Sequence, residues 1–197
     1  MKNRRYLPIV SGGLVICNVI VYICCLFGIG NLYDTGSLDA YAVIYKKEYI
    51  RILSSVFLHA NTAHLFNNML ILFFMGAMIE KEIGHIRFVI LFFLSGIGGN
   101  LMSLYAKVRN ADTAVSVGAS GAVFGLDGVL LAMVLFWGNK PADITPKRVC
   151  LMIFLSLYSG LTGAQIDNAA HIGGLITGFV AGSIMCVIHR AGQKRQQ

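Results

Sequence analysis

Three short segments of the chain carry side chains that together could perform acyl-transfer chemistry. LHANTAHLFNNM contains His59, His64 and Asn68, GASGAVFGLDG contains Ser120, and DNAAHIGGLITG contains His171. An imidazole that takes the proton of a serine hydroxyl turns that hydroxyl into a nucleophile. Backbone N–H groups beside such a serine can stabilise the oxyanion that forms next. These residue types predict a serine nucleophile with a histidine base, provided that the fold brings the three segments together.

The composition indicates a membrane protein. Hydrophobic residues make up 56% of the 197 and charged residues only 13%, with a mean hydropathy of +0.71, whereas soluble domains carry about 25% charged residues. The formal net charge is +7, but the basic residues lie between apolar runs. We interpret them as topology anchors and partners of lipid headgroups, and we expect no nucleic acid as a partner. The five cysteines show no zinc-ligand spacing, so we interpret them as packing residues and expect no metal.

The apolar runs predict an all-α bundle of six membrane-spanning helices in a single domain, residues 1–197. A bilayer-spanning helix needs about 20 mostly apolar residues, and six stretches qualify. The first stretch is too long for the apolar core of a signal peptide, so we expect it to be retained. The six stretches are residues 8–29, 61–79, 87–106, 118–137, 148–165 and 168–188.

The even number of spans predicts that both termini lie on one side of the membrane. With the N-terminus inside, eleven of the 16 Lys and Arg residues are inside and five are outside. This distribution follows the positive-inside rule and predicts an N-in, C-in topology. The second, fourth and sixth spans then all begin at the outer surface. The three polar segments therefore lie at a similar depth, about one or two helical turns below that surface.

Glycines near Ser120 and His171 predict a close contact between the fourth and sixth spans. Small residues at four-residue spacing let membrane helices approach closely, which would bring Ser120 within hydrogen-bond reach of His171. Ser120 also lies at a helix start, where unpaired backbone N–H groups are available to an oxyanion. The glycines are Gly118, Gly121, Gly125 and Gly128 at or on the fourth span, and Gly174, Gly178 and Gly182 on the sixth.

The motifs GASG with Ser120, AHIGG with His171, and HANTAHLFNN together resemble the signature of the rhomboid intramembrane proteases, over essentially the whole chain. The resemblance implies a six-helix bundle that hydrolyses a transmembrane or juxtamembrane peptide bond with a Ser–His dyad, through an acyl-enzyme and without metal or cofactor. We therefore expect an integral multi-pass protein of a bacterial plasma membrane. Its expected partners are single-pass or other transmembrane substrates and membrane lipids. The sequence carries no signal for an oligomeric state.

The resemblance also implies roles for individual residues. Ser120 is the expected nucleophile, and His171 is the expected general base and then acid. His64 and Asn68 are expected to form the oxyanion hole with the backbone N–H of Ser120. His59, five residues before His64, is expected to shape the outer loop or the access of water.

Further residues are expected to support this site. The family often has tyrosine four residues after the serine, and here Phe124 keeps ring stacking against His171 possible but lacks the hydroxyl. Glu80, at the inner end of the second span, matches a position that the family often fills with glutamate, and we expect it to be structural. The supporting residues are Gly118, Gly121, Phe124 and Gly174.

Two carboxyl groups lie near the expected site. Asp127 is two turns deeper than Ser120, about 10 Å along the axis, which is too far to orient His171 from a straight helix. We favour a buried neutral acid that bonds another helix. Asp167 is one turn above His171 and could orient it, but we favour a cap of the sixth span, because Asp and Asn are preferred at helix starts.

Two other function classes provide alternatives. A transporter or proton channel would line its path with intramembrane His, Asn and Asp side chains, but the polar residues here cluster near one face and no inverted repeat is evident. A non-catalytic rhomboid-like protein that binds transmembrane helices would be expected to lack Ser120 or His171, and both are present.

Overall fold

The computed structural model describes residues 6–137, 144–162 and 167–194. Within these residues every regular element is a helix, and the one extended pairing is an isolated antiparallel bridge between Leu38 and Ser116. The predicted all-α class is confirmed. Residues 163–166, where the fifth predicted span ends, lie outside the described residues.

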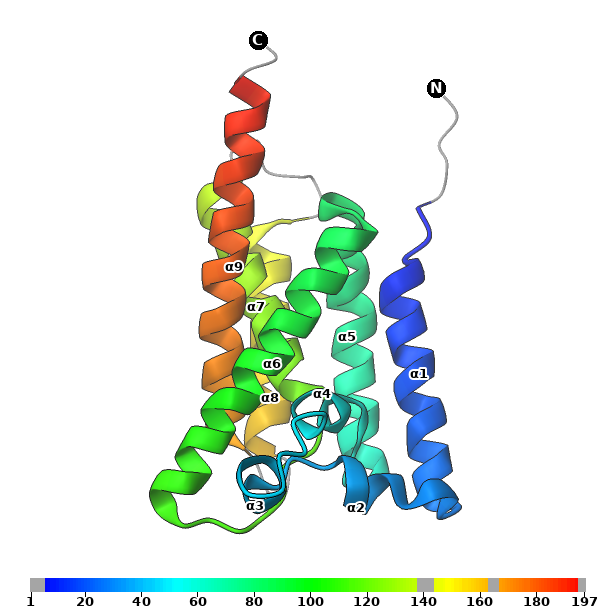
Figure 1. The fold of residues 1–197 in the computed structure, drawn as a ribbon. Coiled ribbons are helices and arrows are strands. Elements are labelled where there is room, and N and C mark those ends of the chain that lie inside the picture. Colours follow the sequence, from blue (N-terminus) through cyan, green and yellow to red (C-terminus); the bar gives the residue numbers. More distant parts are fainter. Residues whose placement is uncertain (1–5, 138–143, 163–166, 195–197) are drawn as a thin grey trace.

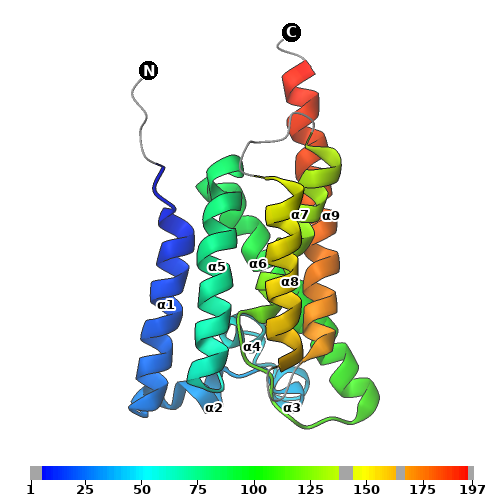
Figure 2. The ribbon, with the colours of Figure 1, turned by 180° about the vertical axis from the view of Figure 1, so that it is seen from behind.

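Six helices of 17 residues or more lie alongside one another (Figures 1 and 2). Four of them, α1, α5, α6 and α9, are long and apolar enough to cross a membrane, and α7 is apolar but shorter. The start of α1 and the end of α9 lie at the same end of the bundle. The helices are α1 (Ile9–Leu26), α5 (Thr62–Ile83), α6 (His85–Asn110), α7 (Ser120–Phe136), α8 (Pro146–Thr162) and α9 (Asn168–Lys194).

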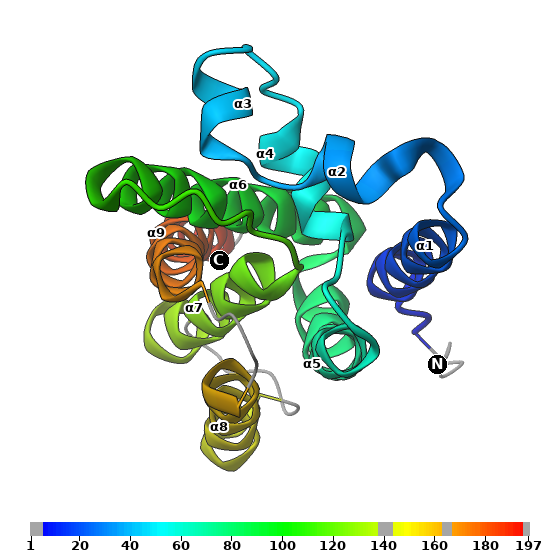
Figure 3. The same ribbon diagram turned by 90° about the horizontal axis from the view of Figure 1, so that it is seen from below.

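Helix α7 lies inside the bundle, where it packs against both α6 and α9 and lies beside α5 and α8 (Figure 3). Every residue from Gly121 to Leu130 is buried, so neighbouring helices cover all sides of this segment. A 17-residue helix is about 26 Å long, shorter than the hydrocarbon core of about 30 Å. The surrounding helices therefore shield α7, and its start can lie below their ends.

Glycines form the contact between α7 and α9. A Cβ atom added at Gly174 would overlap the carbonyl oxygen of Gly121 and lie 2.8 Å from its carbonyl carbon. One turn further along, a Cβ at Gly178 would overlap the carbonyl oxygen of Gly125. Apolar carbon atoms normally stay about 3.5–4.0 Å apart. The two backbones therefore touch, and only glycine fits at these positions.

The segment between α1 and α5 folds into short helices that lie against the side of α6 (Figure 3). The guanidinium of Arg51 holds this segment together, because it donates to the carbonyl oxygens of Asp34 at 2.7 Å and Ser37 at 3.0 Å. It also pairs with Glu48 at 2.6 Å. The short elements are η1 (Ile29–Asn31), α2 (Leu32–Gly36), α3 (Ala40–Ile44), α4 (Arg51–Ser54) and η2 (Ser55–Phe57).

Helix α1 is attached to α5 at both of its ends. The buried carboxylate of Glu80 accepts hydrogen bonds from the backbone N–H groups of Val10 at 2.9 Å and Ser11 at 2.8 Å, and from the Ser11 hydroxyl at 2.7 Å. Two of the unpaired N–H groups at the start of α1 are thereby satisfied. At the other end, the hydroxyls of Tyr22 and Thr62 are 2.9 Å apart. Glu80 thus has the structural position expected for it.

Candidate active site

Ser120 is the first residue of α7 and follows a tight backbone turn at Gly118. Gly118 has a φ of 130°, a conformation that favours glycine, and its N–H donates to the carbonyl oxygen of Ser55 at 2.9 Å. A Cβ added at Gly118 would lie 2.7 Å from Cε1 of His64 and 3.6 Å from Oγ of Ser120. The His64 ring and the Ser120 hydroxyl therefore both lie close to this glycine.

His59, His64 and Asn68 form one polar cluster at the start of α5. Asn61 caps this helix by accepting a hydrogen bond from the His64 N–H at 2.8 Å. The His59 ring is buried, and its centroid is 5.1 Å from that of His64. Asn68 is buried one turn below His64. Neither the amide nitrogen of Asn68 nor either ring nitrogen of His59 has a hydrogen-bond partner in the described part of the chain.

His171 lies in the first turn of α9, and its imidazole stacks on Phe124. The ring centroids are 4.1 Å apart and the planes are 8° from parallel. Phe124 follows Ser120 by one turn of α7, so the stack holds the imidazole over the first turns of that helix.

The α7–α9 contact lies at the level of Ser120 and His171. Gly121 is the residue after Ser120, and Gly174 is three residues after His171, so the two helices touch immediately beside both side chains. Among the described residues, neither the Ser120 hydroxyl nor the His171 ring forms a side-chain hydrogen bond. The structure thus places the two groups at one level of touching helices.

Asp167 fixes the start of α9 to the loop that leads to Ser120. One carboxylate oxygen accepts from the N–H of Ala170 at 2.9 Å, which caps α9 as favoured from the sequence. The other oxygen accepts from the hydroxyl of Ser116 at 2.5 Å and from that of Ser103 on α6. Sequence reasoning missed both serines. A small polar residue at Ser103, inside an otherwise apolar run, is the signal that could have identified one of them.

Residues 46–188 match the protein-family model of the Rhomboid domain. The chain belongs to the rhomboid family. Among curated relatives, it is 35% identical over 172 residues to RHOMBOID-like protein 1 of Arabidopsis thaliana, covering 85% of this chain and 42% of that protein. It is 33% identical over 161 residues to Rhomboid protease GluP of Bacillus subtilis (strain 168), covering 79% of this chain and 31% of GluP. Rhomboid-like protease 1 of Toxoplasma gondii is 38% identical over 138 residues, covering 68% of this chain and 46% of that protease.

The family and the long apolar helices together make this rhomboid an integral multi-pass membrane protein. It spans from about a third to about half of the length of the curated relatives that it matches. Those relatives come from a plant, a bacterium and a protozoan parasite. They do not support the sequence-based expectation of a bacterial plasma membrane.

The deeper carboxyl group of this rhomboid, Asp127, is separate from the site. Asp127 is 2% exposed, and its Oδ1 has no hydrogen-bond partner in the described residues. The side chain near it is that of Ser156 on α8, which is fully buried. Among the described residues, Asp127 and His171 share no hydrogen bond or ion pair. The burial of Asp127 beside α8 is as expected, whereas its bond to another helix stays a prediction, because neither Asp127 Oδ1 nor Ser156 Oγ has a hydrogen-bond partner among the described residues.

The loop before the site is anchored to the end of α6. The buried ammonium of Lys107 donates to the carbonyl oxygen of Ala114 at 2.7 Å and is 3.5 Å from the carboxylate of Asp112. The N–H of Ala114 and the Lys107 charge keep the pKa of the Asp112 carboxyl below its ordinary value. Together with the bridge between Leu38 and Ser116, these contacts fix the backbone of the segment that connects α6 to Ser120.

Proposed function

We propose that this rhomboid is an intramembrane serine endopeptidase that hydrolyses peptide bonds in or near transmembrane segments of other membrane proteins. The observation that carries the proposal is the contact of Gly121 with Gly174, which brings α7 and α9 together beside Ser120 and His171. The relatives from B. subtilis and T. gondii, which are named as proteases, support the same activity.

In the proposed reaction, Ser120 Oγ attacks the carbonyl carbon of the scissile bond while His171 takes the hydroxyl proton. His171 then donates that proton to the leaving amine, and an acyl-enzyme remains on Ser120. Water, activated by His171 as base, hydrolyses the ester and restores the hydroxyl. The stack on Phe124 would keep the imidazole in position through both half-reactions.

The proposed oxyanion hole consists of the side chains of Asn68 and His64 and the backbone N–H of Ser120. Two features support it. Within the described part of the chain the buried amide nitrogen of Asn68 has no hydrogen-bond partner, and such a donor costs about 1–3 kcal/mol unless it bonds something. The first N–H groups of α7 have no partner within the helix. The ring nitrogens of His59, which bond no other described residue, could hold the water that the second half-reaction needs.

We further propose that all six long helices span the membrane with both termini inside. The support is the distribution of Lys and Arg along the sequence. In this topology α7 starts below the outer surface, which gives Ser120 access to water from outside. A substrate helix would enter between α5 and α8 and unwind locally, because a helix hides its carbonyl groups in hydrogen bonds.

The test is cleavage of a fluorescent transmembrane substrate, together with labelling by a serine-directed fluorophosphonate. Ser120→Ala and His171→Ala should each lower the cleavage rate by at least about a thousandfold, and Ser120→Ala should abolish labelling. Ser183→Ala and His189→Gln, which change a serine and a histidine of α9 away from the site, serve as matched controls and should retain activity. Equal, background-level cleavage by wild type and Ser120→Ala would refute the proposal, and transmembrane-helix binding by both would favour a non-catalytic protein. A proton flux into liposomes would instead favour a transporter.

A further inference from the structure

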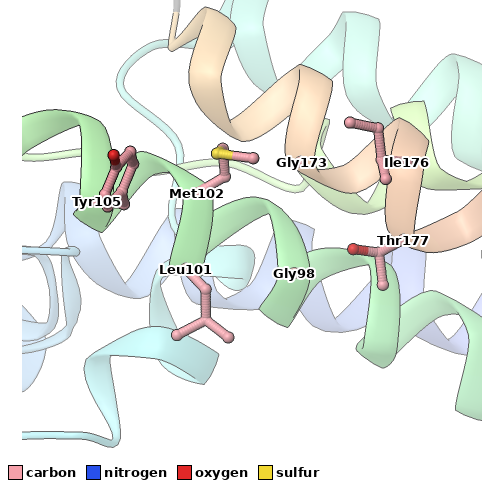
Figure 4. A pocket seen from close by; sticks show the side chains of 7 residues that line it. All are labelled: Gly98, Leu101, Met102, Tyr105, Gly173, Ile176 and Thr177. Carbon is pink, nitrogen blue, oxygen red and sulfur yellow. The ribbon is translucent and has the colours of Figure 1, made fainter.

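A groove of about 350 Å³ runs along the outside of the bundle between α6 and α9. Figure 4 shows side chains from both helices around it. The floor contains two glycines, and the sides are mostly apolar. The lining residues are Gly98, Leu101, Met102 and Tyr105 of α6, and Gly173, Ile176 and Thr177 of α9.

The groove opens toward the hydrocarbon of the membrane. Both helices are long and apolar enough to span a bilayer, and the side chains of Leu101, Tyr105 and Ile176 are at least half exposed. From Gly98 to Tyr105 the groove extends about 10 Å along α6, which is most of the depth of one leaflet, about 15 Å. An acyl chain of that leaflet can therefore lie in it along most of its length.

The glycines of the groove do not offer a second membrane helix a close approach. A Cβ added at Gly98 would overlap the side chain of Thr177, and one at Gly173 would lie 2.8 Å from the carbonyl oxygen of Gly98. Both glycines are therefore used in the contact between α6 and α9. Partner helices prefer a flat surface of small residues, whereas Leu101 and Met102 make this surface uneven. A flexible chain fits such a surface better than a rigid helix.

A cation lies beyond the Tyr105 end of the groove. Helix α6 has 26 residues, about 39 Å, which exceeds the hydrocarbon thickness of about 30 Å, so its last turn reaches the headgroups. Arg109 is one turn after Tyr105 on the same face and is exposed. No ion pair in the described residues involves Arg109, and the carboxylate of Asp112 is already engaged by Lys107. Tyrosine and arginine are the side chains expected beside a lipid phosphate.

We propose that the α6–α9 groove binds one phospholipid, with an acyl chain along Leu101 and Met102 and the phosphate at Tyr105 and Arg109. The lipid would lie behind the first two turns of α9, on the side away from α7. Binding requires no peptidase activity, so it can be tested in the Ser120→Ala variant as well as in the wild type.

The probe is phosphatidylglycerol with a photoactivatable diazirine in one acyl chain, incorporated into nanodiscs with the full chain. Illumination should label peptides that contain residues 98–105 and 173–177. Leu101→Trp fills the groove and should reduce this labelling at least about fivefold. Leu94→Trp, which changes a leucine of similar exposure two turns earlier on α6, is the matched control and should leave labelling unchanged. Thermal melting of both variants checks that they fold.

The headgroup is tested by native mass spectrometry of retained lipid. Arg109→Gln should weaken phosphatidylglycerol retention about fivefold, and Arg87→Gln, at the opposite end of α6, should not. Diacylglycerol with the same chains but no phosphate should be retained less than phosphatidylglycerol by the wild type. Equal labelling of all lipid-facing helices would overturn the proposal. So would a dimer of the chain that Leu101→Trp dissociates, because a second copy would then occupy the groove.

Discussion

Alanine at Gly174 should impair cleavage through a displacement of α9. The added Cβ would overlap the carbonyl oxygen of Gly121 and lie 2.8 Å from its carbonyl carbon, so α9 must move by about 1 Å to restore ordinary contact distances. Overpacking of this kind costs about 1–3 kcal/mol of stability. A misplacement of about 1 Å between reacting groups can cost about a hundredfold in rate. We therefore expect kcat to fall by about that factor, with little change in KM.

Other glycines of α9 provide an internal comparison. A Cβ at Gly178 would be as close to the carbonyl oxygen of Gly125 as a Cβ at Gly174 is to that of Gly121. Gly178→Ala should therefore lower the stability of the protein as much as Gly174→Ala. Because Gly178 is one turn farther from His171, this substitution should slow cleavage less. At Gly182 the nearest atom would be 3.0 Å away, the Cα of Val129, so the effects should be smaller. At Gly192 nothing lies within 4 Å, and alanine should be neutral or stabilise by up to about 1 kcal/mol.

The assay combines cleavage of the fluorescent transmembrane substrate with thermal unfolding in the same detergent. Cleavage is measured well below the melting temperature, where the protein is folded. A lower cleavage rate then reports a displaced His171 and not a smaller folded fraction. The reasoning would be refuted if Gly174→Ala cleaved and melted like Gly192→Ala. It would also be refuted if Gly178→Ala lost as much kcat as Gly174→Ala, since position relative to His171 would then be irrelevant.

Three further predictions concern single side chains. Phe124→Leu should reduce kcat about threefold to tenfold through loss of a stack worth about 0.5–1.5 kcal/mol, while Phe124→Tyr should retain it; steady-state kinetics of both variants is the check. Asp167→Ala should lower stability by about 1–3 kcal/mol, from the lost cap and the unpaired Ser116 hydroxyl, and speed hydrogen exchange in residues 112–118; unchanged exchange would contradict the described anchoring. Glu80→Ala should lower stability by about 2–4 kcal/mol, because it leaves the N–H groups of Val10 and Ser11 unpaired; thermal melting together with hydrogen exchange in the first turn of α1 would show it, and protection equal to the wild type would count against it.

The helices could be predicted from the sequence because their signals are local. Each of the six long helices begins within two residues of its predicted start, since a run of apolar residues needs no information from elsewhere in the chain. The glycine spacing likewise predicted the contact between α7 and α9, because small residues at one-turn intervals mark a helix face. The placement of His171 beside α7 followed from that contact.

The hydrogen bonds between distant segments could not be predicted in the same way. Ser103 and Asp167 are 64 residues apart, and Arg51 reaches back 17 residues to Asp34. The two members of such a pair follow no regular spacing along the sequence, and a serine or a carbonyl group has many potential partners. The short helices before α5 were also missed, because four or five residues are too few to show amphipathic spacing. The groove between α6 and α9 depends on how two surfaces meet, which no single segment encodes.

The attachment of α1 through Glu80 has a consequence for biogenesis. A chain made from its N-terminus delivers α1 to the bilayer well before residue 80 has been synthesised. Until then, the N–H groups of Val10 and Ser11 must bond water or lipid headgroups, which keeps that end of α1 at the membrane surface. When α5 has been made, the carboxylate of Glu80 replaces water or headgroups as the acceptor for these two N–H groups. Helix α1 can therefore reach its final position only after α5, which carries Glu80, has been synthesised and inserted.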